Sequence, residues 1–188
     1  MTNVRSAAGL LRKYREAASD YRETCALRDD IASALLPRKP RYLTYREFDR
    51  VVRWKLKGQN PRTARQREPL TDEVVIAVTK AALDIHHSDQ AYCTRVKLGI
   101  LQSLPGVGMG IASAVLALVE PRSYGVIDFM VWDQLFGEER LSFSHTHYEN
   151  YLTCLRALAE ELAWTVQEVD LALWARAEAK QPALRLSC

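Results

Sequence analysis

The chain has 188 residues, 48% of them apolar, and a formal net charge of +3 at pH 7. Its length fits one compact domain, or one core with an attached lobe, and its composition argues against a disordered chain. No apolar run reaches the roughly 18 residues that cross a bilayer, and the start of the chain carries both signs of charge, unlike a secretory signal. We therefore expect an intracellular, non-secreted monomer with no membrane partner: cytoplasmic or nucleoid-associated, or nuclear in a eukaryote.

Helical periodicity runs through every long segment, and no alternating strand pattern is present. Thr44 and Glu47, for example, have the spacing of a capping box, in which two side chains satisfy backbone amides of the first helical turn. We expect a single domain with a core lobe at about 71–143 and a second lobe from 1–70 and 144–188. The sequence predicts an all-α fold of about eight helices in two closely packed lobes, over residues 6–36 (with a break near 29–30), 44–57, 71–85, 89–103, 109–119, 128–136, 146–163 and from 165 onward.

Positive charge is concentrated toward the start of the chain. Residues 1–70 contain 17 Lys and Arg against 8 Asp and Glu, whereas residues 71–188 contain 9 against 15. The densest block, Pro37–Arg67, contains 11 basic and 2 acidic residues. Such a block indicates a polyanionic partner, usually a nucleic acid, although a solvated surface gives the same pattern.

The predicted helix at residues 44–57 has an apolar face and a cationic face. The basic residues of the cationic face are spaced at i, i+4, i+7 and i+11, and they are Arg46, Arg50, Arg53 and Lys57. We expect Arg50, Arg53 and Lys57 to contact a nucleic-acid backbone. Trp54 lies among them and can stack on a base. Gly58 ends this helix, and the sequence predicts a basic loop over residues 58–69.

The stretch LPGVGMG, Leu104–Gly110, predicts a tight turn between two helices. Gly106 and Gly108 can adopt positive φ and leave backbone amides bare, and the second helix begins directly after them. Helix starts present unpaired N–H groups and a partial positive charge, which bind phosphate. We therefore expect Leu104, Gly106, Val107, Gly108 and Gly110 to hold a nucleic-acid backbone without reading its sequence. The alternative is a helical hairpin that uses its glycines only for the turn.

This turn resembles the helix-hairpin-helix motif. Its continuation to Asp128, PGVG…A…VL…YGVID, is similar to the helix-hairpin-helix DNA glycosylases of the endonuclease III superfamily. The similarity is close over Ser103–Gly137 and is otherwise limited to an all-helical layout. It implies a base-excision repair protein that binds damaged double-stranded DNA and flips a base into a pocket. It also implies that hairpin carbonyls can hold a K⁺ or Na⁺ ion.

By this resemblance, Asp128 matches the catalytic aspartate, which would activate water and stabilise positive charge on the deoxyribose. Gly110 stands where strand-cleaving members carry the Schiff-base lysine, so the resemblance implies a monofunctional glycosylase without lysine-based lyase activity. Met130 and Asp133 stand where the family commonly has His and Arg. An aspartate at a helix start is also a good N-cap without any chemistry.

Aromatic side chains are further candidates for contact with an extruded base. Trp54, Tyr92 and Trp132 could stack on it, with core packing as the alternative reading of each. The four cysteines form no CxxC pair, and the two histidine pairs lack the i, i+4 spacing of a metal site. We therefore expect no metal held by side chains and no iron–sulfur cluster.

Two other functions stay open. A non-catalytic DNA-binding or adaptor module that keeps a glycosylase-like fold is favoured by Met130 and Asp133, and it predicts salt-sensitive DNA binding without base release. A protein-interaction domain would instead direct the basic face toward an acidic partner.

Overall fold

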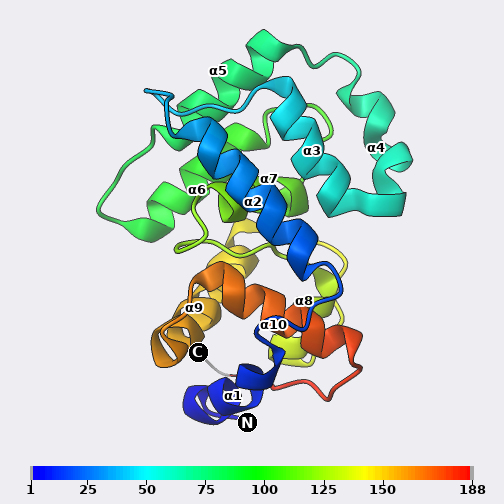
Figure 1. Ribbon diagram of the computed structural model, residues 1–188, viewed down its shortest axis with the longest axis vertical. Helices are drawn as coiled ribbons and strands as arrows, with labels where there is room; N and C mark the ends of the chain where they lie inside the picture. Colours follow the sequence, from blue (N-terminus) through cyan, green and yellow to red (C-terminus); the bar gives the residue numbers. More distant parts are fainter. Residues whose placement is uncertain (1, 187–188) are drawn as a thin grey trace. The chain divides into compact units, whose positions relative to one another are not determined.

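The computed structural model describes residues 2–186, apart from the side chain of Arg62 (Figure 1). The predicted all-α class is confirmed: the described residues form helices and no strand, with one isolated bridge between Thr2 and Leu186. Of the four cysteines, Cys188 lies outside the described residues. The α-helices are α1 (Val4–Leu11), α2 (Tyr21–Leu35), α3 (Tyr45–Leu56), α4 (Asn60–Arg67), α5 (Asp72–Leu83), α6 (Gln90–Leu101), α7 (Met109–Val119), α8 (Phe129–Phe136), α9 (His145–Leu162) and α10 (Val166–Glu178), with 3₁₀ turns η1 (Arg12–Tyr14) and η2 (Lys57–Gln59).

The described residues hold ten α-helices rather than about eight, partly because the predicted helix at 6–36 is two helices. The break falls at residues 12–20, not near 29–30. At this break the amide of Ser19 donates to Oε2 of Glu178 at 2.9 Å, and the Ser19 hydroxyl donates to the other carboxylate oxygen. A tertiary partner thus replaces the hydrogen bond that a continuing helix would supply.

The other additional helix is α4, which lies where the sequence predicts a loop. Pro61 stands in its first turn, where the missing N–H costs nothing because that amide has no intrahelical acceptor. Hydrogen bonds between its own side chains stabilise this helix: the Arg67 guanidinium donates to Thr63 Oγ1 at 2.6 Å and to Asn60 Oδ1 at 2.5 Å. Pro61 is therefore a helix-start signal here.

The described chain divides into two compact units. Unit 1 comprises residues 1–24 and 120–188, and unit 2 comprises residues 25–119. These boundaries differ from those of the expected lobes, because residues 25–70 group with 71–119 and residues 120–143 group with the C-terminal helices. The hairpin turn belongs to unit 2 and Asp128 belongs to unit 1.

In unit 1, α10 packs against α8 and α9, and α1 packs against α9. In α9 the core takes one face of the helix, as the periodicity predicts, and the buried residues include Tyr148, Tyr151, Leu155 and Leu158. Burying such a stripe against neighbouring helices stabilises an amphipathic helix far more than its intrinsic propensity does. α10 is instead buried on all sides, since every residue from Val169 to Leu173 is buried.

In unit 2, α7 is the central helix. Its residues Ile111–Leu118 are all buried, and α3 and α6 pack against it, while α5 packs against both α3 and α6. A helix buried on all sides fixes the position of its own first turn firmly. The glycine-containing turn that precedes α7 is therefore held on a rigid support.

Candidate nucleic-acid interface and carboxylate site

Two buried apolar side chains anchor the turn between α6 and α7. Leu104 and Val107 are buried, and the Val107 amide donates to the Leu104 carbonyl at 3.1 Å. Between them Gly106 has φ +73°, a left-handed conformation that L-residues with a side chain rarely adopt. The requirement for glycine at this position is therefore conformational.

Gly106 also lies against α4. A Cβ atom on Gly106 would stand 2.9 Å from Cγ of Arg67 and 3.1 Å from Cβ of Gln66. The last turn of α4 therefore approaches the bare backbone of the hairpin. Sequence reasoning missed this contact because it predicted a loop at 58–69; Pro61 followed by a run of good helix formers was the signal that could have revealed it.

The space around Gly108 is open, whereas the space around Gly106 is filled by α4. Gly108 is exposed, and no heavy atom lies within 4 Å of the place a Cβ would take. Its carbonyl accepts the first hydrogen bond of α7, from the Ala112 amide at 3.0 Å. The amides of the first turn have no intrahelical acceptor and carry the positive end of the helix dipole. Gly110, one residue into that turn, is half-buried.

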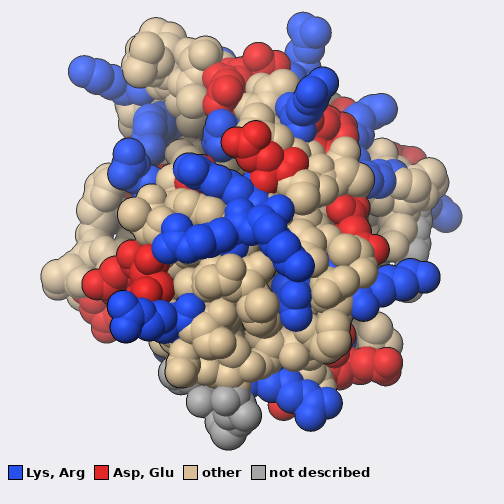
Figure 2. Space-filling view, turned by 60° about the horizontal axis from the view of Figure 1, so that its bottom comes forward, with Lys and Arg blue, Asp and Glu red and all other residues tan. Residues whose placement is uncertain are grey.

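Arg46, Arg50 and Arg53 of α3 are all exposed. Lys57 is exposed too, but it lies just after α3, with φ 45°, and not within the helix predicted at 44–57. Arg50 pairs with Asp30 at 2.6 Å and Arg53 with Asp49 at 2.6 Å. Exposed ion pairs of this kind contribute little to stability, so a phosphate can replace the carboxylate at small cost. Figure 2 shows one face of the molecule on which Lys and Arg side chains gather in groups, with Asp and Glu groups beside them.

Asp128 caps α8 and is half-buried. Its backbone is extended (φ −145°, ψ 151°), Oδ1 accepts the Met130 amide at 3.0 Å, and its carbonyl accepts the Trp132 amide at 2.9 Å. Asp128 is therefore an N-cap in full, as the sequence predicts. A cap of this kind also fixes the orientation of the carboxylate relative to the backbone.

The segment before Asp128 is held by buried polar groups of α9 and α10. The Val126 amide donates to Oδ2 of Asp170 at 2.9 Å, and the Tyr151 hydroxyl donates to Oδ1 of Asp170 and lies 3.1 Å from the Val126 carbonyl. The Tyr148 hydroxyl donates to the Gly125 carbonyl at 2.8 Å. All three side chains are at least 95% buried. This network fixes the backbone that delivers Asp128, and sequence reasoning did not identify it.

The two phenols of this network stay protonated. Burial, and then the nearby Asp170, raise the pKa of Tyr148 and of Tyr151 well above the ordinary value, and Asp128 adds a smaller effect in the same direction at Tyr151. Both hydroxyls are therefore hydrogen-bond donors at neutral pH and well above it. Gly125 allows this segment to pack closely on α9, because a Cβ there would stand 2.4 Å from Cδ1 of Leu155.

The aromatic candidates for base stacking have different surroundings. Tyr92 is 52% exposed, and its ring centroid lies 4.9 Å from that of His87. Trp54 is half-buried. Trp132 is 4% exposed and packs on Phe136, with ring centroids 4.3 Å apart. A stacking role for Trp132 would require that packing to open.

No protein-family model, curated protein or solved structure compared with the chain matches it. In residues 2–186, no group of three or more His, Cys, Asp or Glu side chains could hold a metal ion. No helix among the described residues is long and apolar enough to cross a membrane.

Proposed function

We propose that this protein binds the backbone of damaged double-stranded DNA through Leu104–Gly110 and releases a damaged base by hydrolysis of its N-glycosidic bond, with Asp128 as the catalytic carboxylate. The observation that carries the proposal is the open space at Gly108, directly before the first turn of α7. A phosphate oxygen can approach amides there that any side chain at this position would shield.

Binding of this kind is independent of base sequence, because backbone amides and the helix dipole contact phosphate rather than base edges. Arg50, Arg53 and Lys57 would add charge contacts at the surface of the same unit. A K⁺ or Na⁺ ion on hairpin carbonyls would add a positive charge facing the phosphate, since carbonyl oxygen is the donor type that suits such ions.

Hydrolysis needs a carboxylate beside the sugar, to stabilise the positive charge that develops as the base departs and to orient the attacking water. Asp128 is the candidate, because its cap geometry and the Asp170 network hold it in one orientation. Gly110 offers no amine, so no Schiff base can form at this position. The expected products are a free base and an intact strand with an abasic site.

The DNA-binding part of the proposal is tested by Gly108→Glu, with Gly99→Glu as the matched control. Gly99 is also exposed, also has nothing within 4 Å, and lies on α6 of the same unit. We expect Gly108→Glu to weaken duplex binding about tenfold or more at low salt, because it places a carboxylate where a phosphate would lie. Gly99→Glu should bind within about twofold of wild type. Equal binding by the two variants would refute a role for the turn.

A second candidate function, DNA binding without catalysis, is favoured by one observation. Asp128 caps α8, and this structural role explains an aspartate at the position without any catalysis. This alternative predicts normal duplex binding and sensitivity to Gly108→Glu, together with no base release from any damaged duplex. Base-release assays therefore separate the two functions.

A further inference from the structure

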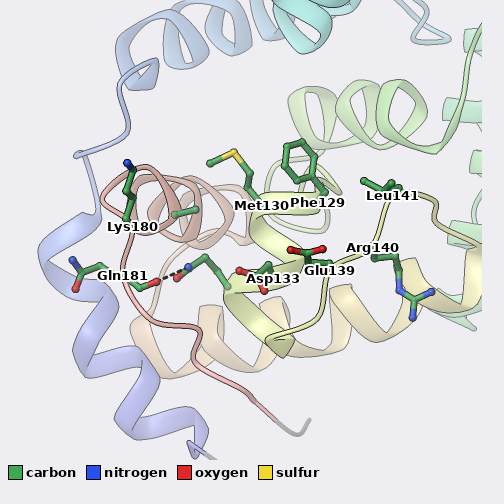
Figure 3. A pocket seen from close by; sticks show the side chains of 10 residues that line it. Phe129, Met130, Asp133, Glu139, Arg140, Leu141, Lys180 and Gln181 are labelled. Atoms are coloured by element: carbon green, nitrogen blue, oxygen red, sulfur yellow. Dashed lines mark hydrogen bonds between the residues drawn. The ribbon is translucent and has the colours of Figure 1, made fainter.

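A cavity of about 490 Å³ lies in unit 1 beside α8 and α10 (Figure 3). Its volume suits a small organic molecule. The lining includes Phe129, Met130, Asp133, Gln134, Glu139 and Leu141. Asp128 is not among the described residues that line it.

One part of this lining is apolar and open to solvent. Phe129 is 50% exposed and Leu141 is 95% exposed, although both are large apolar side chains. Met130, which is half-buried, adds a flexible thioether. In Figure 3 the Phe129 ring and the Met130 side chain rise from α8 along the same edge of the cavity. Exposed apolar side chains gathered around a cavity are typical of a ligand surface.

The other part of the lining consists of hydrogen-bond acceptors that lack donors. In the described chain, the side chains of Asp133 and Glu139 form no ion pair or hydrogen bond. Gln134 is 4% exposed; its Nε2 donates to the Gln181 carbonyl at 2.8 Å, whereas its Oε1 has no partner among the described residues. A buried acceptor without a donor is unfavourable. Oε1 of Gln134 therefore calls for an N–H donor, while Asp133, which is half-buried, and Glu139, which is exposed, offer negative charge to a ligand.

The two basic residues of the lining do not meet this need. The Arg140 guanidinium lies over the Trp132 ring, 5.3 Å from its centroid, and 3.7 Å from Glu138. Figure 3 shows Arg140 directed away from Asp133 and Glu139, and Lys180 on the far side of the cavity from Glu139. Neither basic side chain of the lining thus pairs with Asp133 or Glu139.

We propose that this cavity binds a small organic cation, an ammonium or guanidinium group carried on an apolar or aromatic body. The cationic group pairs with Asp133 and Glu139 through charge-assisted hydrogen bonds. The body of the ligand packs on Met130 and Leu141, and Phe129 adds a cation–π contact. An N–H group of the ligand that reaches Gln134 also satisfies its Oε1. The site is independent of the proposed action on DNA.

The test is titration of the full chain, without DNA, by calorimetry and by NMR of the Gln134 side-chain amide. Tryptamine is the aromatic cation, and indole-3-propionate is its matched ligand with the opposite charge. Agmatine and N-acetylarginine amide are titrated as well, to compare the affinity for a small free guanidinium compound with that for an arginine side chain of a peptide. We expect saturable binding of tryptamine, about tenfold or more tighter than of indole-3-propionate, with a shift of the Gln134 amide signal.

The protein control uses equivalent substitutions inside and outside the lining. Asp133→Asn combined with Glu139→Gln should weaken tryptamine binding about tenfold or more, whereas Glu160→Gln, which changes an exposed carboxylate of α9 outside the lining, should change it less than about twofold. Thermal unfolding of each variant verifies that it is folded. The proposal is overturned if no cation binds saturably, if indole-3-propionate binds as well as tryptamine, or if the double variant binds like wild type.

Discussion

The Val126 amide donates a 2.9 Å hydrogen bond to Oδ2 of Asp170, and this bond ties the backbone just before Asp128 to α10. The Tyr151 hydroxyl donates to the other oxygen of the same carboxyl group. The position of the candidate catalytic residue therefore depends on a residue 42 positions later in the chain, through a buried network that local sequence patterns do not reveal.

Removal of the Tyr151 hydroxyl tests the strength of this network. Tyr151→Phe removes the hydroxyl that donates to Oδ1 of the buried Asp170, so we expect a loss of about 1–3 kcal/mol in the free energy of unfolding. Tyr148→Phe removes a bond to the Gly125 carbonyl alone and should cost less. Urea unfolding of both variants measures the difference. Equal losses would show that Asp170 does not depend on Tyr151.

Gly125→Ala tests the close packing of the same segment. The added methyl group would stand 2.4 Å from Cδ1 of Leu155 and 3.3 Å from Cβ of Asp170, so we expect destabilisation of about 1–3 kcal/mol. Gly9→Ala, on α1 of the same unit, meets nothing within 4 Å and should stabilise the protein by about 0.5–1 kcal/mol. Thermal melting distinguishes them, and a stabilised Gly125→Ala variant would contradict the packing described.

The ion pair of Arg38 and Glu47 predicts a dependence of stability on pH. Burial by itself raises the pKa of Glu47, but hydrogen bonds from Arg38 and Thr44 outweigh it, so the pKa is lowered from the ordinary 4.5. A lowered folded-state pKa stabilises the protein above the unfolded-state value, and the stabilisation is lost as pH falls through the folded-state value.

Glu47→Gln should therefore lower the free energy of unfolding by about 1–2 kcal/mol at pH 7. The difference from wild type should shrink as the pH is lowered below about 4.5. Urea unfolding at a series of pH values measures it. A difference that stays constant down to pH 3 would contradict the lowered pKa.

The sequence predicts well those features that are set by local chemistry. Thr44 and Asp128 are N-caps, as predicted, and α7 has the predicted bounds, because caps and apolar stripes act within one or two turns. The break before α2 could not be predicted in this way, since Glu178 supplies the hydrogen bonds of Ser19 from the other end of the chain. Likewise, the network around Asp170 and the cavity beside α8 join residues that lie far apart in the sequence.

The proposed activity is tested most directly by single-turnover release of free base from a panel of duplexes that each contain one damaged base. We expect wild type to release a base from at least one duplex and to leave the strand intact until alkali cleaves it. Asp128→Asn keeps the N-cap, because Asn caps as well as Asp, and should slow release about a hundredfold or more. Asp89→Asn, the same change at the cap of α6, should have little effect. Release of no base from any duplex, or unchanged release by Asp128→Asn, would contradict the proposal.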